Sequence, residues 1–305
     1  MSMSSYKLSW LLRLLSLSMA SSFSTMAART ILITGATDGI GQHTAKKLAA
    51  DGNHLLIHGR RPDLGRNLEA DLVMRGAASV QYFNADLSDL QQVENLAKEI
   101  LEKQQPIDVL INNAGIFDPP RPAKSAQGYD YTWAVNVMAP YVLTRRLLPL
   151  VAASKDDCPR IITTSSISQS YTLPPLDDLF AVNDKPKSGH SAYSDSKLGD
   201  YLFTVQLAKL LKAHPKFERV KCLTMDPGTV NTKMLLAGWG ACGIPVSRAD
   251  NTYELATDYG SQQTSGSYHF GGGGSRDAKD DPKLKALFEK LAECTGCTYD
   301  DIGEI

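Results

Sequence analysis

Tyr193 and Lys197 stand four residues apart at the start of a long helical pattern, AYSDSKLGDYLFTVQLAKLL. Residues at positions i and i+4 of a helix share one face, so the two side chains project together. A phenol has a pKa of about 10, and a neighbouring ammonium group favours its ionised form. The pair therefore predicts proton exchange with a substrate oxygen. The same spacing also occurs on solvated helix faces, so its place in the fold must decide between the two interpretations.

The elements that position this pair follow a strand–helix alternation that begins at residue 30. Short apolar runs of β type occupy 30–34, 54–58, 79–84, 108–111, 160–164 and 220–224, with helical patterns between them. Such alternation predicts a parallel sheet covered by helices on both faces, and right-handed crossovers make it doubly wound. We expect an α/β, Rossmann-type doubly wound parallel sheet in a single domain over residues 30–305.

Four smaller features complete this prediction. Ser88 with Gln91 predicts a capping box for the helix after the third strand. Residues 168–189, rich in Pro, Asp and Ser, predict an insertion above the sheet. The segment GGGGS at 271–275 predicts a flexible surface loop, and 282–292 a final charged helix.

The first strand runs directly into the glycine-rich segment TGATDGIG at 34–41. Glycine is needed where the backbone turns with positive φ or approaches a ligand closely, and the helix that follows presents free N–H groups. Three glycines alone could form only a tight turn, but at the first strand–helix junction of a parallel sheet they predict a pyrophosphate site. Asp38 would weaken phosphate binding through its charge or would cap the helix, and we expect the cap.

The end of the second strand distinguishes NAD from NADP. A carboxylate at this place usually binds the ribose hydroxyls of NAD. This chain has Arg60 and Arg61 there instead, and guanidinium groups bind a 2′-phosphate through charge-assisted hydrogen bonds. NADP(H) is therefore the favoured cofactor and NAD(H) the less favoured one. The alternative is that the two arginines are surface residues at the start of a helix.

Five motifs, in this order, resemble the short-chain dehydrogenase/reductase family between residue 30 and about residue 270. They are TGATDGIG (34–41), NNAG (112–115), the serine pair 165–166, YSDSK (193–197) and DPGTVNT (226–232). Three further segments are similar to the retinol-dehydrogenase-like branch: AVNVMAPYVLT (134–144), SKLGDYLFT (196–204) and SGSYHF (265–270). Two departures are a wide separation between the second serine and the tyrosine, and Asp226 before Pro-Gly, where that branch often has another residue type.

The resemblance implies a catalytic site of four residues. Tyr193 corresponds to the general acid or base, and Lys197 to the residue that favours its ionised form and binds the nicotinamide ribose. Ser166 corresponds to the serine that holds the substrate oxygen. Asn136 corresponds to the asparagine that supports a proton relay to solvent.

The resemblance also implies a set of cofactor contacts. The predicted cofactor residues are Gly35, Thr37, Gly39, Ile40, Gly41, Arg60, Arg61, Asp86, Leu87, Asn113, Ala114, Gly115, Tyr193, Lys197, Pro227, Gly228, Val230 and Thr232. Asp86 matches an adenine contact, 113–115 the segment beside the adenine ribose, and 227–232 the loop that touches the nicotinamide amide. Cys294 and Cys297 form a lone C-x-x-C without a second ligand pair, so we expect no metal there.

These residues predict an NADP(H)-dependent oxidoreductase that transfers hydride between nicotinamide and a carbonyl or alcohol group of a small molecule. The alternative is an NADP(H)-binding regulatory or scaffold protein with the same fold and little turnover, which the presence of both Tyr193 and Lys197 disfavours. Two apolar groups would suit a lipophilic substrate if they close over the nicotinamide, or would only pack their segments against the core. They are Tyr171, Leu173, Leu176, Leu179 and Phe180, and Met234, Leu235, Leu236, Trp239 and Ile244.

Composition bears on partners and compartment. Lys+Arg (32) and Asp+Glu (33) nearly cancel, which gives no support for nucleic-acid binding. Five scattered cysteines favour a reducing compartment. Residues 1–29 are basic, Ser-rich and free of acidic residues, so they predict a mitochondrial or other organelle transit peptide, a secretory signal, or a disordered tail of a cytoplasmic protein. We expect no stable membrane span, and the resemblance leaves open a homo-oligomer formed through the long helices.

Overall fold

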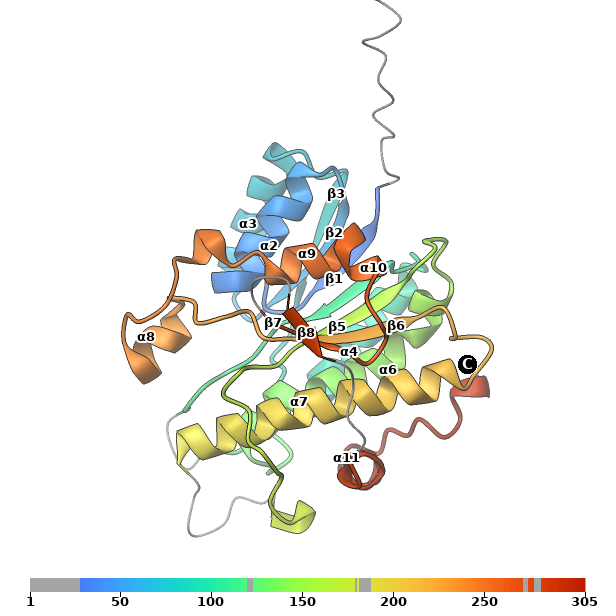
Figure 1. The fold of residues 1–305 in the computed structure, drawn as a ribbon. Coiled ribbons are helices and arrows are strands. Elements are labelled where there is room, and N and C mark those ends of the chain that lie inside the picture. The colour runs from blue at the N-terminus through green and yellow to red at the C-terminus, as the bar shows by residue number, and fades with distance from the viewer. Residues whose placement is uncertain are drawn as a thin grey trace, which may run out of the picture.

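Eight strands form one sheet in the part of the chain that the computed structural model describes, residues 28–119, 123–178, 180, 188–270, 274–276 and 281–304 (Figure 1). They are β1 (Thr30–Ile33), β2 (His54–Gly59), β3 (Ser79–Asn84), β4 (Val109–Asn112), β5 (Arg160–Thr164), β6 (Lys221–Met225), β7 (Tyr268–Phe270) and β8 (Gly274–Arg276). Their order is β3-β2-β1-β4-β5-β6-β7-β8. All neighbours pair in parallel except β7 and β8. The predicted α/β doubly wound sheet in a single domain is confirmed.

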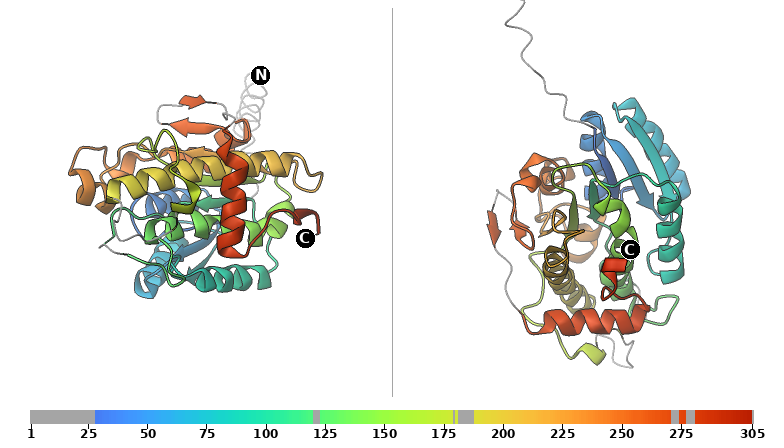
Figure 2. Two further views of the ribbon diagram at one scale, coloured as in Figure 1. Left: turned by 90° about the horizontal axis from the view of Figure 1, so that it is seen from below. Right: turned by 90° about the vertical axis from the view of Figure 1, so that its right-hand side faces the viewer.

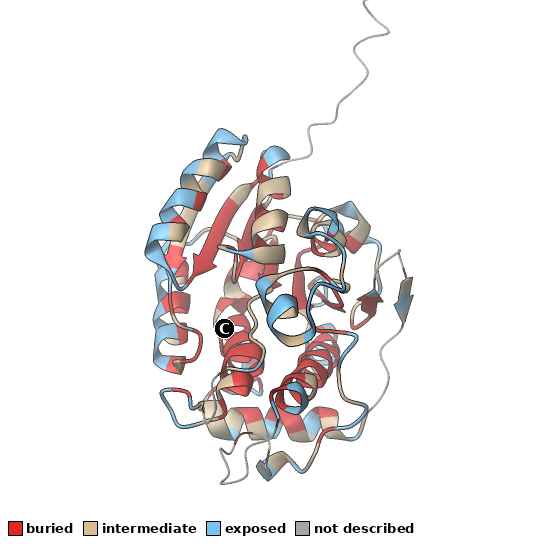
Figure 3. Ribbon diagram, turned by 90° about the vertical axis from the view of Figure 1, so that its left-hand side faces the viewer, coloured by how far each residue is buried: buried red, intermediate tan, exposed pale blue. Residues whose placement is uncertain are grey.

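Helices cover both faces of this sheet because its strands bury side chains on both sides (Figure 3). Successive strand residues point to opposite faces, so Leu32 of β1 packs into one core cluster and its neighbours Ile31 and Ile33 into the other. The helices of the first face are α4 (Leu90–Glu102), α6 (Ala139–Ala152) and α7 (Gly189–Lys212). Those of the second face are α2 (Gly39–Ala50), α3 (Pro62–Met74) and α9 (Asn251–Ala256).

Shorter elements connect this framework. They are α5 (Tyr131–Trp133), the π-helical turn η1 (Ala134–Met138), η2 (Leu176–Asp178), α8 (Lys233–Trp239), η3 (Val246–Arg248), α10 (Asp258–Ser261), α11 (Lys283–Thr295) and η4 (Ile302–Glu304). Strand β1 lies between β2 and β4, so the direction in which strands are added reverses beside it. Ligands of such sheets bind in the crevice at the carboxyl ends of the strands that flank this switch point.

Two helix starts test the predicted caps. Asp38 precedes α2 and its side chain accepts the N–H of Gly39, so the predicted cap is confirmed. The capping box of Ser88 with Gln91 is wrong. A turn in which the Asp89 N–H donates to the Asp86 carbonyl moves the helix start, and Asp89 caps α4 by accepting the Gln91 N–H at 3.0 Å.

The C-terminal region also differs from its prediction. Gly274 and Ser275 lie in β8, which pairs antiparallel with β7, so the flexible loop predicted over 271–275 is wrong at these two positions; 271–273 lie outside the described residues. A backbone of Gly and Ser pairs here because the neighbouring strand offers its free edge. The final helix extends to Thr295 and ends at Gly296, whose φ of 65° is the left-handed conformation that favours glycine at this position.

Helix α11 lies across α7 on the side away from the sheet (Figure 2). Phe288 of α11 stacks on Phe203 of α7 with ring centroids 5.8 Å apart, and it also contacts Tyr141 of α6. Part of the long helix α7, of the kind through which a homo-oligomer could form, is therefore covered by the chain's own C-terminal segment. The oligomeric state itself stays a prediction.

The predicted leader, residues 1–29, lies outside the described residues except for its last two. Arg29 is held by the domain: its side chain donates to Asp156 at 2.5 Å and to Asp258 at 3.0 Å, and its backbone N–H donates to Asn53. The targeting role of the leader stays a prediction.

A buried histidine links the second strand to the loop after the first. His58 Nε2 lies 3.1 Å from the Ala85 carbonyl oxygen, and the Gly35 N–H approaches Nδ1 at 3.4 Å. This pattern assigns the proton to Nε2 of a neutral ring. Burial lowers the pKa of His58 to about 4, against the smaller opposing effect of the Ala85 carbonyl.

This low pKa predicts an acid-sensitive fold. In the unfolded chain His58 takes up a proton near pH 6.5, whereas the folded protein resists protonation until pH 4. The stabilisation is therefore present above pH 6.5 and is lost as the pH falls through 4, by about 2.5 kcal/mol between pH 7.5 and 4.5. The test is the free energy of unfolding, measured with urea at several pH values. We expect it to depend less on pH in His58→Gln than in the wild type. An equal pH dependence would contradict the assignment.

Candidate active site

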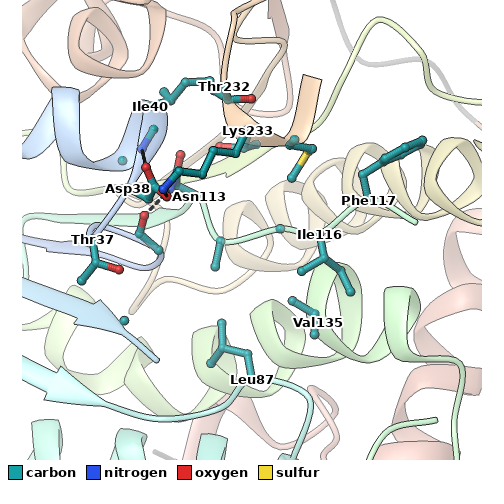
Figure 4. A pocket seen from close by; sticks show the side chains of 18 of the residues that line it. Thr37, Asp38, Ile40, Leu87, Asn113, Ile116, Phe117, Val135, Thr232 and Lys233 are labelled. Atoms are coloured by element: carbon teal, nitrogen blue, oxygen red, sulfur yellow. Dashed lines mark hydrogen bonds and ion pairs between the residues drawn. The ribbon is translucent and has the colours of Figure 1, made fainter. Parts of the chain in front are cut away.

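A cavity of about 780 Å³ opens at the carboxyl ends of β1, β2, β4 and β5 (Figure 4). All of the predicted cofactor residues line it except Gly228 and Val230, and so do residues that were not among the predicted cofactor contacts. The additional lining residues are Asp38, His58, Gly59, Ile116, Phe117, Val135, Thr164, Ser165, Lys233 and Met234. Parallel strands bring segments that are distant in the sequence to one edge, which is why these residues meet.

The glycine loop packs closely against neighbouring backbone at the end of β4 and within itself because it lacks side chains at two positions. Gly35 has a φ of 66°, and a Cβ there would lie 2.9 Å from the Ala114 Cα atom. A Cβ on Gly41 would lie 2.4 Å from the Gly35 carbonyl oxygen. The open N-terminus of α2 therefore faces the cavity, and its N–H groups and dipole suit a pyrophosphate. These residues fit a dinucleotide.

The loops after β1 and β4 are clamped together beneath this cavity. The hydroxyl oxygen of Thr34 accepts the backbone N–H groups of Asn113 (3.0 Å) and Ala114 (3.1 Å). In return, the side-chain amide of Asn113 donates to the Thr34 carbonyl oxygen at 2.9 Å. The asparagine that the family resemblance placed beside the adenine ribose thus also holds the glycine loop in place.

Charged residues ring the entrance beside α2. Arg60 is exposed, lines the cavity and donates to the Tyr131 hydroxyl at 3.2 Å. Lys233 reaches across from α8 to Asp38 at 2.6 Å, and Arg61 lies 3.9 Å from the same carboxylate (Figure 4). Partial burial opposes ionisation of Asp38, but Lys233, the Gly39 N–H and Arg61 outweigh it and lower its pKa. The negative charge of Asp38, which in the alternative interpretation would weaken phosphate binding, is therefore compensated.

Tyr193 and Lys197 both line the cavity from the first half of α7. The Lys197 ammonium lies 5.7 Å from the centre of the Tyr193 ring. It donates to the Thr164 carbonyl oxygen and to Asp200 Oδ2, each at 2.8 Å. Burial opposes its charge, but Asp200, and to a smaller extent Tyr193, raise the pKa of Lys197. The sequence prediction did not include Asp200, although its i+3 spacing from Lys197 was a signal for an ion pair.

The two serines after β5 have different partners. The Ser165 hydroxyl donates to the Lys197 carbonyl oxygen at 2.7 Å and so attaches α7 to the end of the sheet. The Ser166 hydroxyl oxygen accepts the Ser168 N–H at 3.1 Å, which leaves its own proton for another acceptor. Ser166 is buried beside the cavity lining rather than part of it.

Asn136 ties three elements together from the π-helical turn η1. Its Oδ1 accepts the Ile116 N–H at 2.8 Å, and its amide donates to the Ile116 carbonyl (3.1 Å) and to the Ser196 hydroxyl (3.0 Å). A Cβ on Gly115 would lie 3.5 Å from both Asn136 Oδ1 and Lys197 Nζ. Asn136 therefore lies on the floor of the site, below its lining residues. Single π turns of this kind are frequent at functional sites.

The segment after β6 that contains α8, residues 232–242, forms a short lid. The residues on either side of this lid are held together. Asn231 exchanges two hydrogen bonds of 2.8 Å with the backbone of Gly243, and Val230 is bridged to Ile244. Val230 is buried in this fastening, which accounts for its place outside the cavity. Asp226 is buried, and its carboxylate accepts N–H groups from Gly228 and from Ile167 in the loop after β5. Burial raises the pKa of Asp226.

The lid contributes Trp239 to an aromatic cluster around Tyr193. Trp239, at the end of α8, lies 4.3 Å from Phe117, 4.9 Å from His190 and 6.1 Å from Tyr193, measured between ring centroids. Phe117 also meets Tyr193 edge to face at 5.4 Å. This aromatic cluster is a tertiary feature, because its members come from three distant segments. Of its residues, the sequence analysis named only Tyr193 and Trp239.

The predicted apolar groups of the two flanking segments have different fates. In the insertion, Leu173 and Phe180 are buried in the core, Leu176 packs against it, and Tyr171 is fully exposed; Leu179 lies outside the described residues. The insertion thus packs on the core. In the segment after β6, Met234 lines the cavity, whereas Leu236, Trp239 and Ile244 are largely exposed.

The described ranges also bear on metal binding and on membrane insertion. Over the described ranges, no group of three or more His, Cys, Asp or Glu side chains is arranged to hold a metal ion. Within the same ranges, no helix combines the length and the apolar character needed to cross a bilayer.

The sheet order, the glycine loop at the switch point and the Tyr193–Lys197 pair in one cavity define a Rossmann-type oxidoreductase. The sequence profile of the family described as short chain dehydrogenase matches residues 29–176. The chain belongs to this family, in its retinol-dehydrogenase-like branch. Its members are oxidoreductases that act on alcohol and carbonyl groups.

Individual relatives show how far the likeness extends. Human retinol dehydrogenase 14 is 31% identical over 298 residues, which cover 88% of this chain and 84% of the relative. Human polyprenol dehydrogenase is 32% identical over 207 residues, 67% of this chain but only 61% of the relative's own length. Among solved structures, a blue fluorescent protein from a metagenomic library in complex with NADPH is 25% identical, with a TM-score of 0.61, over 81% of this chain and 97% of that one.

Asn136 should contribute strongly to stability, because Asn136→Ala leaves the Ile116 N–H, the Ile116 carbonyl and the Ser196 hydroxyl without this partner. Asn112→Ala is the matched control: Asn112 is equally buried but makes a single hydrogen bond, to Thr144, and its Oδ1 is unpaired. We expect Asn136→Ala to lose at least about 2 kcal/mol more than the control in urea unfolding, at about 1 kcal/mol per hydrogen bond. Equal losses would show that Asn136 does not hold the site together.

Proposed function

We propose that the protein is an NADP(H)-dependent oxidoreductase that transfers hydride between nicotinamide and a carbonyl or alcohol group of a small molecule. One observation carries the proposal: Tyr193 and the charged, buried Lys197 line the same cavity as the glycine loop. A site of this kind places an acid next to the position where a dinucleotide's reactive ring would lie. The family supports the same reaction class.

Each catalytic residue has a definable task in reduction. Bound NADPH supplies a hydride to the carbonyl carbon. The Tyr193 hydroxyl donates its proton to the carbonyl oxygen, and in the reverse direction Tyr193 takes the proton from the alcohol. Ser166 retains a hydroxyl proton with which to hold the substrate oxygen. Lys197 keeps its positive charge beside Tyr193, with its ammonium 5.7 Å from the centre of the Tyr193 ring.

Charge at the cavity entrance supports NADP(H) over NAD(H). The end of β2 carries no carboxylate, and Arg60 and Arg61 line the cavity where a 2′-phosphate would lie. The Asp38 charge is compensated by Lys233 and Arg61. The solved relative bound to NADPH has the same fold and is consistent with this assignment.

The substrate that fits best is lipophilic. Ile116, Phe117, Val135 and Met234 line the cavity, and Trp239 extends this apolar wall to the surface. An apolar wall with a few convergent polar groups suits a substrate whose single oxygen is held while its body is desolvated. The names of the relatives, retinol and polyprenol dehydrogenases, point to the same substrate class.

Tyr193→Phe tests the reaction. The variant keeps the ring and its contact with Phe117 but lacks the proton that the substrate oxygen requires. We expect NADPH oxidation with a panel of aldehydes, ketones and quinones to fall by at least about 100-fold, while the affinity for NADPH, measured by its fluorescence, stays within about twofold. A wild-type protein that binds NADPH but reduces no member of the panel would instead support the regulatory or scaffold function.

Arg60→Ala tests the cofactor preference. Loss of one charge-assisted contact to a 2′-phosphate should raise the Kd for NADPH by about tenfold and leave the Kd for NADH unchanged. Arg66→Ala is the control, because Arg66 is an exposed arginine of α3 outside the cavity lining. If Arg60→Ala weakens NADPH no more than this control does, the preference has another origin.

A further inference from the structure

A buried ion pair lies directly behind the predicted catalytic lysine. Asp200 is one helical turn beyond Lys197, and both side chains are almost completely shielded from solvent. The Lys197 ammonium donates to Asp200 Oδ2 at 2.8 Å, while Asp200 Oδ1 has no hydrogen-bond partner among the described residues. The carboxylate therefore has a single ionic and hydrogen-bonding contact, and that contact is the lysine.

The three N–H donors of Lys197 can be assigned to three directions. One goes to the Thr164 carbonyl oxygen at the end of β5, and the second goes to Asp200. The third is left for the cavity, which Lys197 lines. Two fixed acceptors on the far side thus aim the remaining donor at the space that the proposed nucleotide would fill.

No other charged side chain of the packed elements competes for this position. In the described chain, the elements in contact with α7 include α5, η1, β5, β6 and α11. Turn η1 contains no titratable residue, and Tyr131 of α5 pairs with Arg60. Arg160 and Lys221 begin β5 and β6, at the far ends of these strands from Thr164.

The remaining candidates on α7 and α11 also face elsewhere. Asp195 of α7 accepts a hydrogen bond from Ser170 at 2.7 Å, and α11 packs further along α7, at Phe203. The charge balance around the Lys197 ammonium is therefore decided by Asp200, with Tyr193 as the nearby ionisable group on the cavity side.

We propose that Asp200 is a positioning residue that keeps Lys197 protonated and aimed at the cofactor, so that the Tyr193–Lys197 pair works at neutral and alkaline pH. This inference rests on the proposed function, and it deepens that function by adding a residue behind the catalytic pair. An isolated buried ammonium group would tend to lose its proton, because burial disfavours the charged form. The carboxylate offsets that cost.

The pair has a defined pH dependence. Burial raises the pKa of Asp200 to about 7, although Lys197 acts to lower it. Above this pH the carboxylate is charged and supports Lys197; below it the carboxyl group is neutral and the support is lost. Asp200→Asn keeps an oxygen acceptor of the same shape without the charge, so the variant resembles the acid form of the wild type at every pH.

The experiment compares Asp200→Asn with Asp195→Asn, the same change at another buried carboxylate of the same helix. The Lys197 ammonium is observed by NMR in uniformly labelled protein without cofactor, and is assigned from the spectrum of Lys197→Met. In Asp200→Asn we expect Lys197 to lose its proton at least about one pH unit lower than in the wild type, and in Asp195→Asn no change. The wild-type Lys197 resonance should also show a step near pH 7, where Asp200 titrates.

Kinetics with any carbonyl compound that the wild type reduces add a second readout. At pH 6, kcat/KM of Asp200→Asn should match the wild type; at pH 9 it should be at least about tenfold lower. Asp200→Ala, which also removes the hydrogen-bond acceptor, should be impaired at both pH values. If Asp200 only supported the fold, Asp200→Asn would lower Tm, but the pH dependence of kcat/KM would be the same in the variant and the wild type.

One result would overturn the proposal: the same Lys197 titration in the wild type and in Asp200→Asn. If Asp200→Asn does not fold, the same comparison with Asp200→Ala decides, because that variant also lacks the carboxylate. Because the NMR titration requires no turnover, it also separates this proposal from the proposed function. An inactive wild type with the expected titration would reject the oxidoreductase and retain the ion pair.

Discussion

Burial of the strands on both faces is the constraint on which the rest of the structure depends. Ile31, Leu32 and Ile33 are all fully buried, so helices must cover each side of the sheet and the connections between the parallel strands β1 to β7 must cross over. The crossovers make the strands parallel and place their carboxyl ends at one edge. The glycine loop, the serines after β5 and the start of α7 meet there for this reason.

At this edge, the site is held by polar contacts between loops rather than by further apolar packing. Thr34 and Asn113 clamp the loops after β1 and β4, and Asn136 connects the second of these loops to α7. The Lys197 ammonium is placed by Thr164 and Asp200. Because most of these groups are buried, each hydrogen bond is costly to leave unmade. The loops are therefore held in place without apolar side chains between them, and the pocket can remain open.

The lid after β6 has a different character. Helix α8 has no buried residue, and its contacts with the rest of the site include the Lys233–Asp38 pair and the aromatic contacts of Trp239 with Phe117, His190 and Tyr193. Elements with few buried contacts lie at the low-stability end of a fold, where opening is least costly. The aromatic contacts lie on the apolar side of the cavity, whereas the ion pair lies on the side of the glycine loop.

Much of this molecule is determined locally, and the sequence alone was sufficient there. The strand–helix alternation, the cap at Asp38 and the i+4 spacing of Tyr193 and Lys197 depend on residues close together in the chain, and so the sheet and most of the cavity lining were predicted. The capping box at Ser88 failed because a neighbouring aspartate formed a better cap. Only the tertiary structure decided the partners of groups distant in sequence: Lys233 with Asp38, Trp239 with Phe117, and the burial that makes Asp200 matter to Lys197. Spacing identifies which side chains share a helix face, but burial and contact between loops arise only when the whole sheet has assembled.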